Sequence, residues 1–187
     1  MPSSHDNFGA FEVNDMPTSL PVFDSTVVAW VKEHAPAGLP ILDVGAGSGK
    51  YGRLLRNVCP EIDCVEVYAP YIEKFALKEV YRKVYAEDIR NFLKHAKKDV
   101  YGLAIMGDIL EHLGARDGPI VVRRLLAIIP RLIVVVPYKS VQGAYRGVES
   151  EIHLQADLTP EIMSVRYPDL ELLTNTMTKG VYYGDKH

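Results

Sequence analysis

Residues 43–49 read DVGAGSG and place three glycines at alternate positions. The apolar run 39–44 predicts a strand that leads into this stretch, and the helical spacing of apolar residues over 51–58 predicts a helix that follows it. Glycine allows positive φ and a close approach of the backbone to a ligand, and three of them exceed what a simple turn needs. Residues 43–49, called the glycine loop below, therefore predict a binding site for a nucleotide-type ligand.

The spacing inside the glycine loop separates three kinds of nucleotide site. A phosphate loop of an NTPase needs four residues between its first glycine and a Gly-Lys pair, followed by Ser or Thr. Here Gly45 and Gly49 enclose only three residues, and Tyr51 follows Lys50, so this interpretation fails. A dinucleotide fingerprint needs glycine or alanine three positions after its second glycine, where this chain has Lys50. The dinucleotide interpretation is weakened but stays open.

Strands and helices alternate along the rest of the chain. Besides 39–44, strands are expected over 62–67, 83–86, 101–106 and 131–136. Helices are expected from a cap cluster at 24–26 to Pro36, and over 51–58, 70–78, 89–96 and 119–129. Such alternation predicts a parallel sheet with helices on both faces. A terminal antiparallel hairpin is expected from the runs 170–178 and 181–183, joined through Lys179 and Gly180.

Length and punctuation predict the domain organisation. With 187 residues the chain is expected to form one domain over 24–187. The polar, proline-rich residues 1–23 predict an N-terminal arm or cap. Residues 138–158 are too many for an ordinary connection and predict a lid-like loop. Thr159 and Pro160 predict the start of the helix that follows.

Composition and charge exclude several classes of protein. The net charge of −3 provides no positive field for a nucleic acid backbone. The two cysteines are too few for a disulfide scaffold, and no apolar run reaches the length of a membrane span. The N-terminus lacks the pattern of a secretory signal. We therefore expect a cytoplasmic protein with no membrane partner. The charge does not support a nucleic acid partner but does not exclude one, and the sequence leaves the oligomeric state open.

The glycine loop is similar to the first motif of class I S-adenosylmethionine-dependent methyltransferases, an acidic residue followed by alternate glycines. The resemblance spans about residues 24–183. It implies an α/β, doubly wound, mostly parallel seven-stranded sheet of order 3-2-1-4-5-7-6 with strand 7 antiparallel and helices on both faces, which the expected hairpin fits. It also implies S-adenosyl-L-methionine as cofactor and methyl transfer to an oxygen, nitrogen or carbon of a small-molecule acceptor. An NAD-dependent oxidoreductase and a catalytically silent methyltransferase-like binding subunit remain the alternatives.

Cofactor contacts are expected at the carboxyl ends of the predicted strands. Glu66 ends the second strand, where a carboxylate can bind both ribose hydroxyls, as it also does in dehydrogenases. Asp88 follows the third strand, where the family pattern places an acceptor for the adenine amino group, although a helix N-cap explains it equally well. The expected cofactor-binding residues are Asp43, Gly45, Ala46, Gly47, Gly49, Glu66, Val67, Asp88, Ile89 and Asp108.

Candidate catalytic residues follow the fourth strand and lie in the lid. Residues 106–113, MGDILEHL, resemble the fourth motif of many methyltransferases that act on small molecules. Asp108, Glu111 and His112 also resemble a metal-binding variant of some quinone-precursor O-methyltransferases, but the motif is widespread in enzymes without metal, and we expect none. Glu151 and His153 would face the same side of an extended lid. The catalytic candidates are His153 and His112 as bases, and Asp108.

Overall fold

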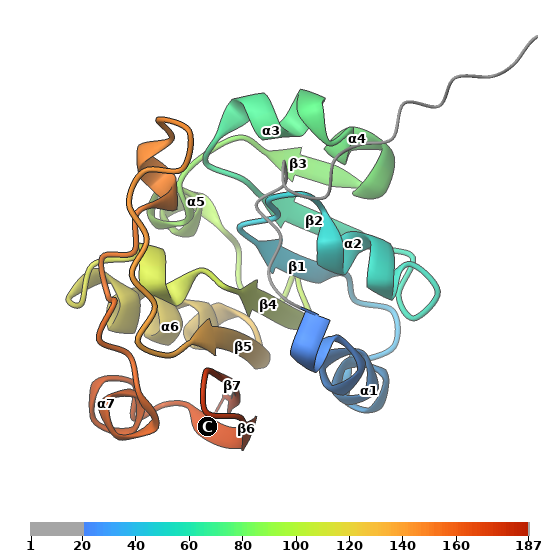
Figure 1. Ribbon diagram of the computed structural model, residues 1–187. Helices are drawn as coiled ribbons and strands as arrows, with labels where there is room; N and C mark the ends of the chain where they lie inside the picture. The colour runs from blue at the N-terminus through green and yellow to red at the C-terminus, as the bar shows by residue number, and fades with distance from the viewer. Residues whose placement is uncertain (1–20, 187) are drawn as a thin grey trace, which may run out of the picture.

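Seven strands form one sheet in the order β3-β2-β1-β4-β5-β7-β6 in the computed structural model, which describes residues 21–186 (Figure 1). The strands are β1 (Ile41–Val44), β2 (Ile62–Val65), β3 (Lys83–Tyr85), β4 (Leu103–Gly107), β5 (Arg131–Pro137), β6 (Glu171–Asn175) and β7 (Lys179–Asp185). The first five pair in parallel, while β7 runs antiparallel to both β5 and β6. The predicted strand order and the antiparallel seventh strand are confirmed.

Helices cover both faces of the sheet, as the sequence predicted (Figure 1). They are α1 (Asp24–His34), α2 (Lys50–Leu55), α3 (Ala69–Lys74), α4 (Leu77–Val80), α5 (Ile89–His95), α6 (Asp117–Ile128) and α7 (Pro160–Arg166), with short 3-10 turns η2 (Pro21–Phe23), η3 (Leu110–His112) and η4 (Glu149–Glu151). One apolar core packs α5, α6 and α7 against the sheet, and a second packs α1 to α4 against the other face. Within residues 21–186 no helix combines the length and the apolar character that a membrane crossing requires.

The central strands are apolar at successive positions because each face of the sheet is a core. Along β4, Ala104 belongs to one core and Ile105 to the other. Along β5, Leu132 and Ile133 alternate in the same way. Strands buried on both faces lose the apolar and polar alternation of a half-exposed strand. This explains why β4 and β5 were recognisable as central from the sequence alone.

Two predicted boundaries are wrong, and tertiary contacts explain both. The expected cap cluster at 24–26 makes no side-chain cap bond: Phe23 is the N-cap of α1, and Asp24 lies 2.5 Å from Lys50 Nζ in an ion pair with α2. Lys179 and Gly180 do not join the hairpin but begin β7, and residues 176–178 make the turn. The Lys179 side chain is buried and forms an ion pair with Asp108.

The expected helix over 70–78 is divided into α3 and α4. Ala76 has φ 49 and lies in the left-handed region, which ends the regular helical hydrogen bonding after α3. The segment 138–158 contains only the short turn η4 and an isolated bridge between Tyr145 and Val148. Thr159 caps α7 as predicted, since its side chain accepts the Ile162 N–H at 3.2 Å. Of the predicted arm 1–23, residues 1–20 lie outside the described residues.

The buried hydroxyl of Tyr81 forms hydrogen bonds on both sides of the glycine loop, to Asp43 at its start and to Gly52 in α2. The Tyr81 hydroxyl donates to Asp43 Oδ2 at 2.5 Å and accepts the Gly52 N–H at 3.2 Å. Burial raises the pKa of Asp43 from 3.8 to about 7, against the lowering effect of the Tyr81 hydrogen bond; Glu66 adds to the rise, and Lys50 opposes it. Asp43 is thus a structural acid whose ionised form is disfavoured in the fold.

Replacing Asp43 by Asn should therefore flatten the pH dependence of stability. Folded Asp43 keeps its proton to higher pH than unfolded Asp43, so the stability it contributes is full below pH 3.8 and is lost as the pH rises towards about 7. We expect the wild type to lose roughly 2–4 kcal/mol from this group across that window. Asn accepts the Tyr81 hydrogen bond but does not ionise. Denaturant unfolding of both proteins across the window measures the difference, and equal pH profiles would contradict the assignment.

Candidate functional site

A cavity of about 840 Å³ opens at the carboxyl ends of β1, β2, β4 and β5. In doubly wound sheets ligands bind at this edge. The predicted site residues that line the cavity are Gly45, Ala46, Gly47, Glu66, Val67, Asp88, Ile89, Asp108, His112 and His153. Asp43 and Gly49 are not among its lining residues: Asp43 bonds Tyr81 behind the loop, and Gly49 packs against Leu77.

The glycine loop needs glycine for backbone conformation and for space. Gly45, Gly47 and Gly49 have φ of 75, 51 and 79, in the left-handed region. A Cβ on Gly45 would overlap the Ile109 side chain, whereas a Cβ on Gly47 would meet nothing within 4 Å. Because Gly47 also lines the cavity, its bare backbone leaves room there that a side chain would fill.

Glu66 joins the glycine loop to the end of β2. Its Oε2 accepts the Gly47 N–H at 2.8 Å, and its Oε1 accepts the Tyr68 N–H at 2.8 Å. The side chain is 4% exposed and lines the cavity. Burial raises its pKa, while the hydrogen bonds from Tyr68 and Gly47 oppose that rise. Each carboxylate oxygen keeps acceptor capacity for a ligand hydroxyl.

Asp88 is an N-cap, one of the two roles that the sequence allowed. Its Oδ1 accepts the Arg90 N–H at 2.7 Å, and its carboxylate pairs with the Arg90 guanidinium at 2.7 Å. Hydrogen bonds from the Arg90 side chain hold the pKa of Asp88 below its usual value. Asp88 also lines the cavity, so the cap leaves it within reach of a ligand.

Asp108 is held by a lysine that sequence analysis missed. Lys179 Nζ donates to Asp108 Oδ2 at 2.8 Å, and Lys179 is 6% exposed. The pairing of β5 with β7 sets Pro137 opposite Lys179 and so brings this lysine to the carboxyl edge of β4. No local pattern marks Lys179, because its position depends on the register of the hairpin.

Two histidines from distant segments meet in the cavity. The rings of His112, on η3, and His153, in the segment 138–158, have centroids 4.8 Å apart and stand edge to face. His112 Nδ1 lies 3.2 Å from the Ile152 carbonyl, and His153 Nδ1 lies 2.9 Å from the Ser140 carbonyl. A carbonyl only accepts, so each Nδ1 donates and each neutral ring keeps a lone pair on Nε2. Burial, together with the neighbouring His153, lowers the pKa of His112 to about 4.

A buried acid lies beside these rings. Glu111 is 1% exposed, and its Oε1 lies 4.0 Å from His112 Nε2. Its Oε2 has no hydrogen-bond partner among the residues that the structure describes. Burial raises the pKa of Glu111 well above its usual value, and Asp108 raises it further. A carboxylate oxygen left without a partner in a protein interior calls for an explanation.

Glu151 and His153, the acid and base expected in the lid, both line the cavity. Their side chains turn to different partners: Glu151 is hydrogen-bonded to Tyr71, and His153 faces His112. Burial raises the pKa of Glu151, while Tyr71 and His153 oppose that rise. The contact with Tyr71 links the segment 138–158 to α3, the helix that follows β2.

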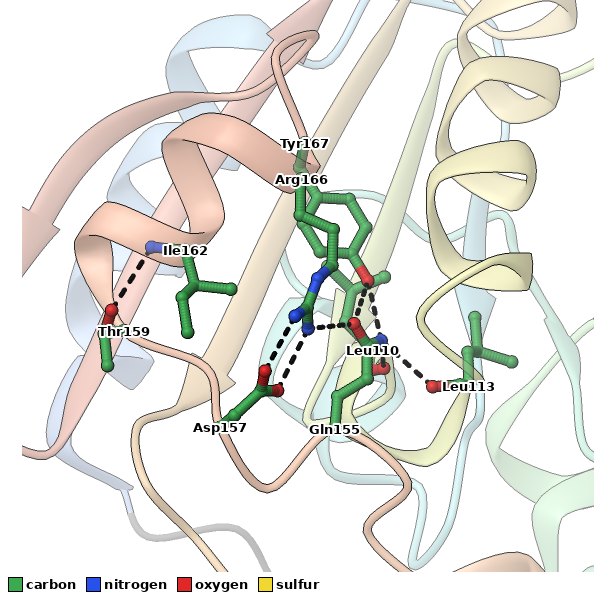
Figure 2. A network of polar contacts seen from close by, with 8 residues as sticks. All are labelled: Leu110, Leu113, Gln155, Asp157, Thr159, Ile162, Arg166 and Tyr167. Atoms are coloured by element: carbon green, nitrogen blue, oxygen red, sulfur yellow. Dashed lines mark hydrogen bonds and ion pairs between the residues drawn. The ribbon is translucent and has the colours of Figure 1, made fainter.

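Gln155 fastens the segment 138–158 to η3, as Figure 2 shows. Its amide nitrogen donates to the carbonyls of Leu110 at 2.7 Å and Leu113 at 2.9 Å, and its backbone N–H donates to the Glu111 carbonyl. Its amide oxygen accepts from Arg166 at 2.8 Å and from the Tyr167 hydroxyl at 3.1 Å. Gln155 was not predicted from the sequence, since a single polar residue in a long loop carries no motif.

The chain is similar to known proteins in structure but not detectably in sequence. No family model and no curated protein sequence matches the chain. Solved structures similar to it include the bifunctional kinase-methyltransferase WbdD, with a TM-score of 0.62 and 15% identity over 94% of this chain and 45% of that one. The chain thus spans about half the length of WbdD.

Two further similar structures match over most of both chains. The plantazolicin methyltransferase BpumL, in complex with S-adenosylhomocysteine, has a TM-score of 0.62 and 12% identity over 88% of this chain and 82% of that one. Magnesium protoporphyrin IX methyltransferase (ChlM) from Synechocystis PCC 6803, with bound S-adenosylmethionine, has a TM-score of 0.57 and 18% identity over 88% and 78%. Together with the strand order, these likenesses show that the chain has the class I methyltransferase fold.

Proposed function

We propose that the chain transfers a methyl group from S-adenosyl-L-methionine to an oxygen, nitrogen or carbon of a small-molecule acceptor. One observation carries the proposal: the buried Glu66 carboxylate is fixed to the Gly47 N–H at 2.8 Å, beside the open space over Gly47. This arrangement offers acceptors for ribose hydroxyls next to a backbone that a ligand can approach closely.

The dimensions and surroundings of the cavity support a ligand of this size. About 840 Å³ lies in the range of cofactor and small-molecule sites and leaves room for an acceptor beside the cofactor. BpumL holds S-adenosylhomocysteine and ChlM holds S-adenosylmethionine, which supports the same cofactor here. We assign cofactor binding to the lining residues Gly45, Ala46, Gly47, Glu66, Val67, Asp88 and Ile89. Asp43 and Gly49 do not line the cavity and would instead maintain the conformation of the glycine loop.

The chemistry requires orientation and, for a hydroxyl acceptor, removal of a proton. S-adenosylmethionine supplies a methyl group on a sulfonium, and the S–C bonding pair stays on sulfur when the acceptor lone pair takes the methyl carbon. Asp108, fixed by Lys179, places a carboxylate in the cavity to orient the reactants. Of the imidazoles, His153 suits a general base better than His112, whose pKa burial lowers to about 4.

Calorimetry with S-adenosylhomocysteine, S-adenosylmethionine and NAD tests the proposal. We expect both adenosyl ligands to bind and NAD not to, because an antiparallel β7 departs from the strand order of dinucleotide folds. Release of S-adenosylhomocysteine in a screen of acceptors then measures turnover. Binding of NAD alone would indicate an oxidoreductase, and binding without turnover of any acceptor would indicate a silent binding subunit.

Glu66→Ala should weaken binding of S-adenosylhomocysteine by roughly 10- to 100-fold, because hydrogen bonds to a charged group contribute about 1.5–3 kcal/mol. The change removes the expected ribose acceptor and leaves the Gly47 N–H without its bond. Calorimetry measures the affinity. Glu79→Ala, at an exposed glutamate of α4 outside the cavity lining, is the control and should bind as the wild type does. Equal affinity of both variants would place the cofactor elsewhere.

Gly47→Leu should also weaken cofactor binding, since its side chain would enter the cavity. Gly38→Leu is a matched control: Gly38 has φ 81, its Cβ would meet nothing within 4 Å, and it does not line the cavity. Both changes place Leu at positive φ, at a similar cost of about 1–2 kcal/mol in stability. Thermal unfolding should shift similarly in the two variants, while calorimetry should show weaker binding in Gly47→Leu alone.

A further inference from the structure

We propose that Glu111, His112 and His153 bind one divalent transition-metal ion, whose remaining position takes an oxygen of the acceptor. The second half of this statement rests on the proposed function, whereas metal binding itself does not. The proposal departs from our sequence-based expectation of no metal, and it includes His153 from the segment 138–158 and leaves out Asp108. Asp108 is engaged by Lys179 at 2.8 Å.

The hydrogen bonds of the two histidines leave one ring nitrogen of each without a backbone partner, and the two rings are adjacent, with centroids 4.8 Å apart. Each Nδ1 is committed to a backbone carbonyl, at 3.2 Å for His112 and 2.9 Å for His153. Metal-binding histidines characteristically donate their other N–H to a carbonyl or carboxylate, which fixes the tautomer and orients the ring. Both Nε2 atoms are therefore left as acceptors in the cavity.

The third acceptor is the unpartnered oxygen of Glu111. One potential ligand atom from each of Glu111, His112 and His153 lies within 4.8 Å of the other two. Glu111 Oε2 is buried and has no hydrogen-bond donor among residues 21–186. Three lone-pair donors this close repel one another unless a proton or a metal cation lies between them, and a buried carboxylate without a partner is unfavourable. A metal ion removes both costs.

The kinds of ligand narrow the choice of metal. Two imidazoles and one carboxylate form a typical three-residue catalytic zinc set, which leaves a position open for water or substrate. Imidazole nitrogens favour zinc, cobalt, nickel or iron over magnesium and calcium, which prefer oxygen ligands. A tetrahedral ion with bonds of about 2.1 Å separates its ligands by roughly 3.4 Å. Separations of up to 4.8 Å must therefore shorten, so metal binding should bring the three side chains closer together.

The placement of the site indicates the class of acceptor. The three ligands line the same cavity as Glu66 and Gly47, so an acceptor oxygen on the metal would share the cavity with the cofactor. A bound divalent cation lowers the pKa of a coordinated hydroxyl. We infer a hydroxyl or enol oxygen as the acceptor, with Glu151, which also lines the cavity, taking its proton. As a ligand, His153 would then not act as the base.

Titration of the chelator-treated protein with Co²⁺ tests the site directly. Co²⁺ bound by nitrogen and oxygen ligands absorbs visible light, so binding is measured without any activity assay. We expect a visible spectrum at one equivalent, and at least about a 10-fold loss of Co²⁺ affinity in both Glu111→Gln and His153→Asn. His95→Asn is the control, because His95 pairs with Glu87 at 3.0 Å on an exposed surface and should leave Co²⁺ binding unchanged.

The two proposals fail in different ways. A protein that binds S-adenosylhomocysteine but neither Co²⁺ nor Zn²⁺ overturns the metal site and leaves the methyltransferase proposal standing. Co²⁺ binding that survives both ligand substitutions also overturns it. Co²⁺ binding lost in both variants, together with no binding of S-adenosylhomocysteine to the wild type, supports the metal site and removes the proposed function. His153→Asn changes a residue of a loop, so its Co²⁺ affinity tests the metal site even if Glu111→Gln does not fold.

Discussion

The side-chain amide of Gln155 joins the two segments that form the proposed acceptor side of the cavity, η3 and residues 138–158. Its nitrogen donates to the carbonyls of Leu110 and Leu113, which flank Glu111 and His112 on η3, and to the Tyr167 hydroxyl at 2.7 Å. A 3-10 turn of three residues has too few bonds of its own to hold two side chains in place. His153 lies two residues before Gln155, so the same amide helps to hold His153 near η3.

The polar groups around Gln155 are hydrogen-bonded or ion-paired to one another. The nearby Glu111 Oε2, which has no partner among the described residues, is an exception. Arg166 donates to the amide oxygen and pairs with Asp157 at 2.7 Å, so its charge is balanced. Glutamate at position 155 would have no hydrogens for the two carbonyls, and leucine would have no polar group at all. Against this background, Glu111 Oε2 is an acceptor that the described part of the fold leaves open.

The sequence predicted features whose residues are neighbours in the chain, and missed those that tertiary contacts assemble. The glycine loop, Glu66 and the cap at Asp88 each follow a strand, so local spacing found them. Lys179 was placed in a turn because the register of β7, not a motif, brings it to Asp108. The tautomers of His112 and His153 depend on carbonyls 40 and 13 residues away along the chain, and no local pattern encodes them.

The two sides of the cavity therefore differ in how the fold constrains them. The proposed cofactor side is formed by the ends of β1 and β2, where the Glu66 carboxylate accepts the backbone N–H groups of Gly47 in the glycine loop and of Tyr68 after β2. The acceptor side depends on the segment 138–158, which is held by side-chain contacts such as those of Gln155 and Glu151. Changes in a surface segment disturb a scaffold less than changes in its sheet. If the proposed roles hold, acceptor specificity can thus change in this fold while the proposed cofactor contacts at β1 and β2 persist.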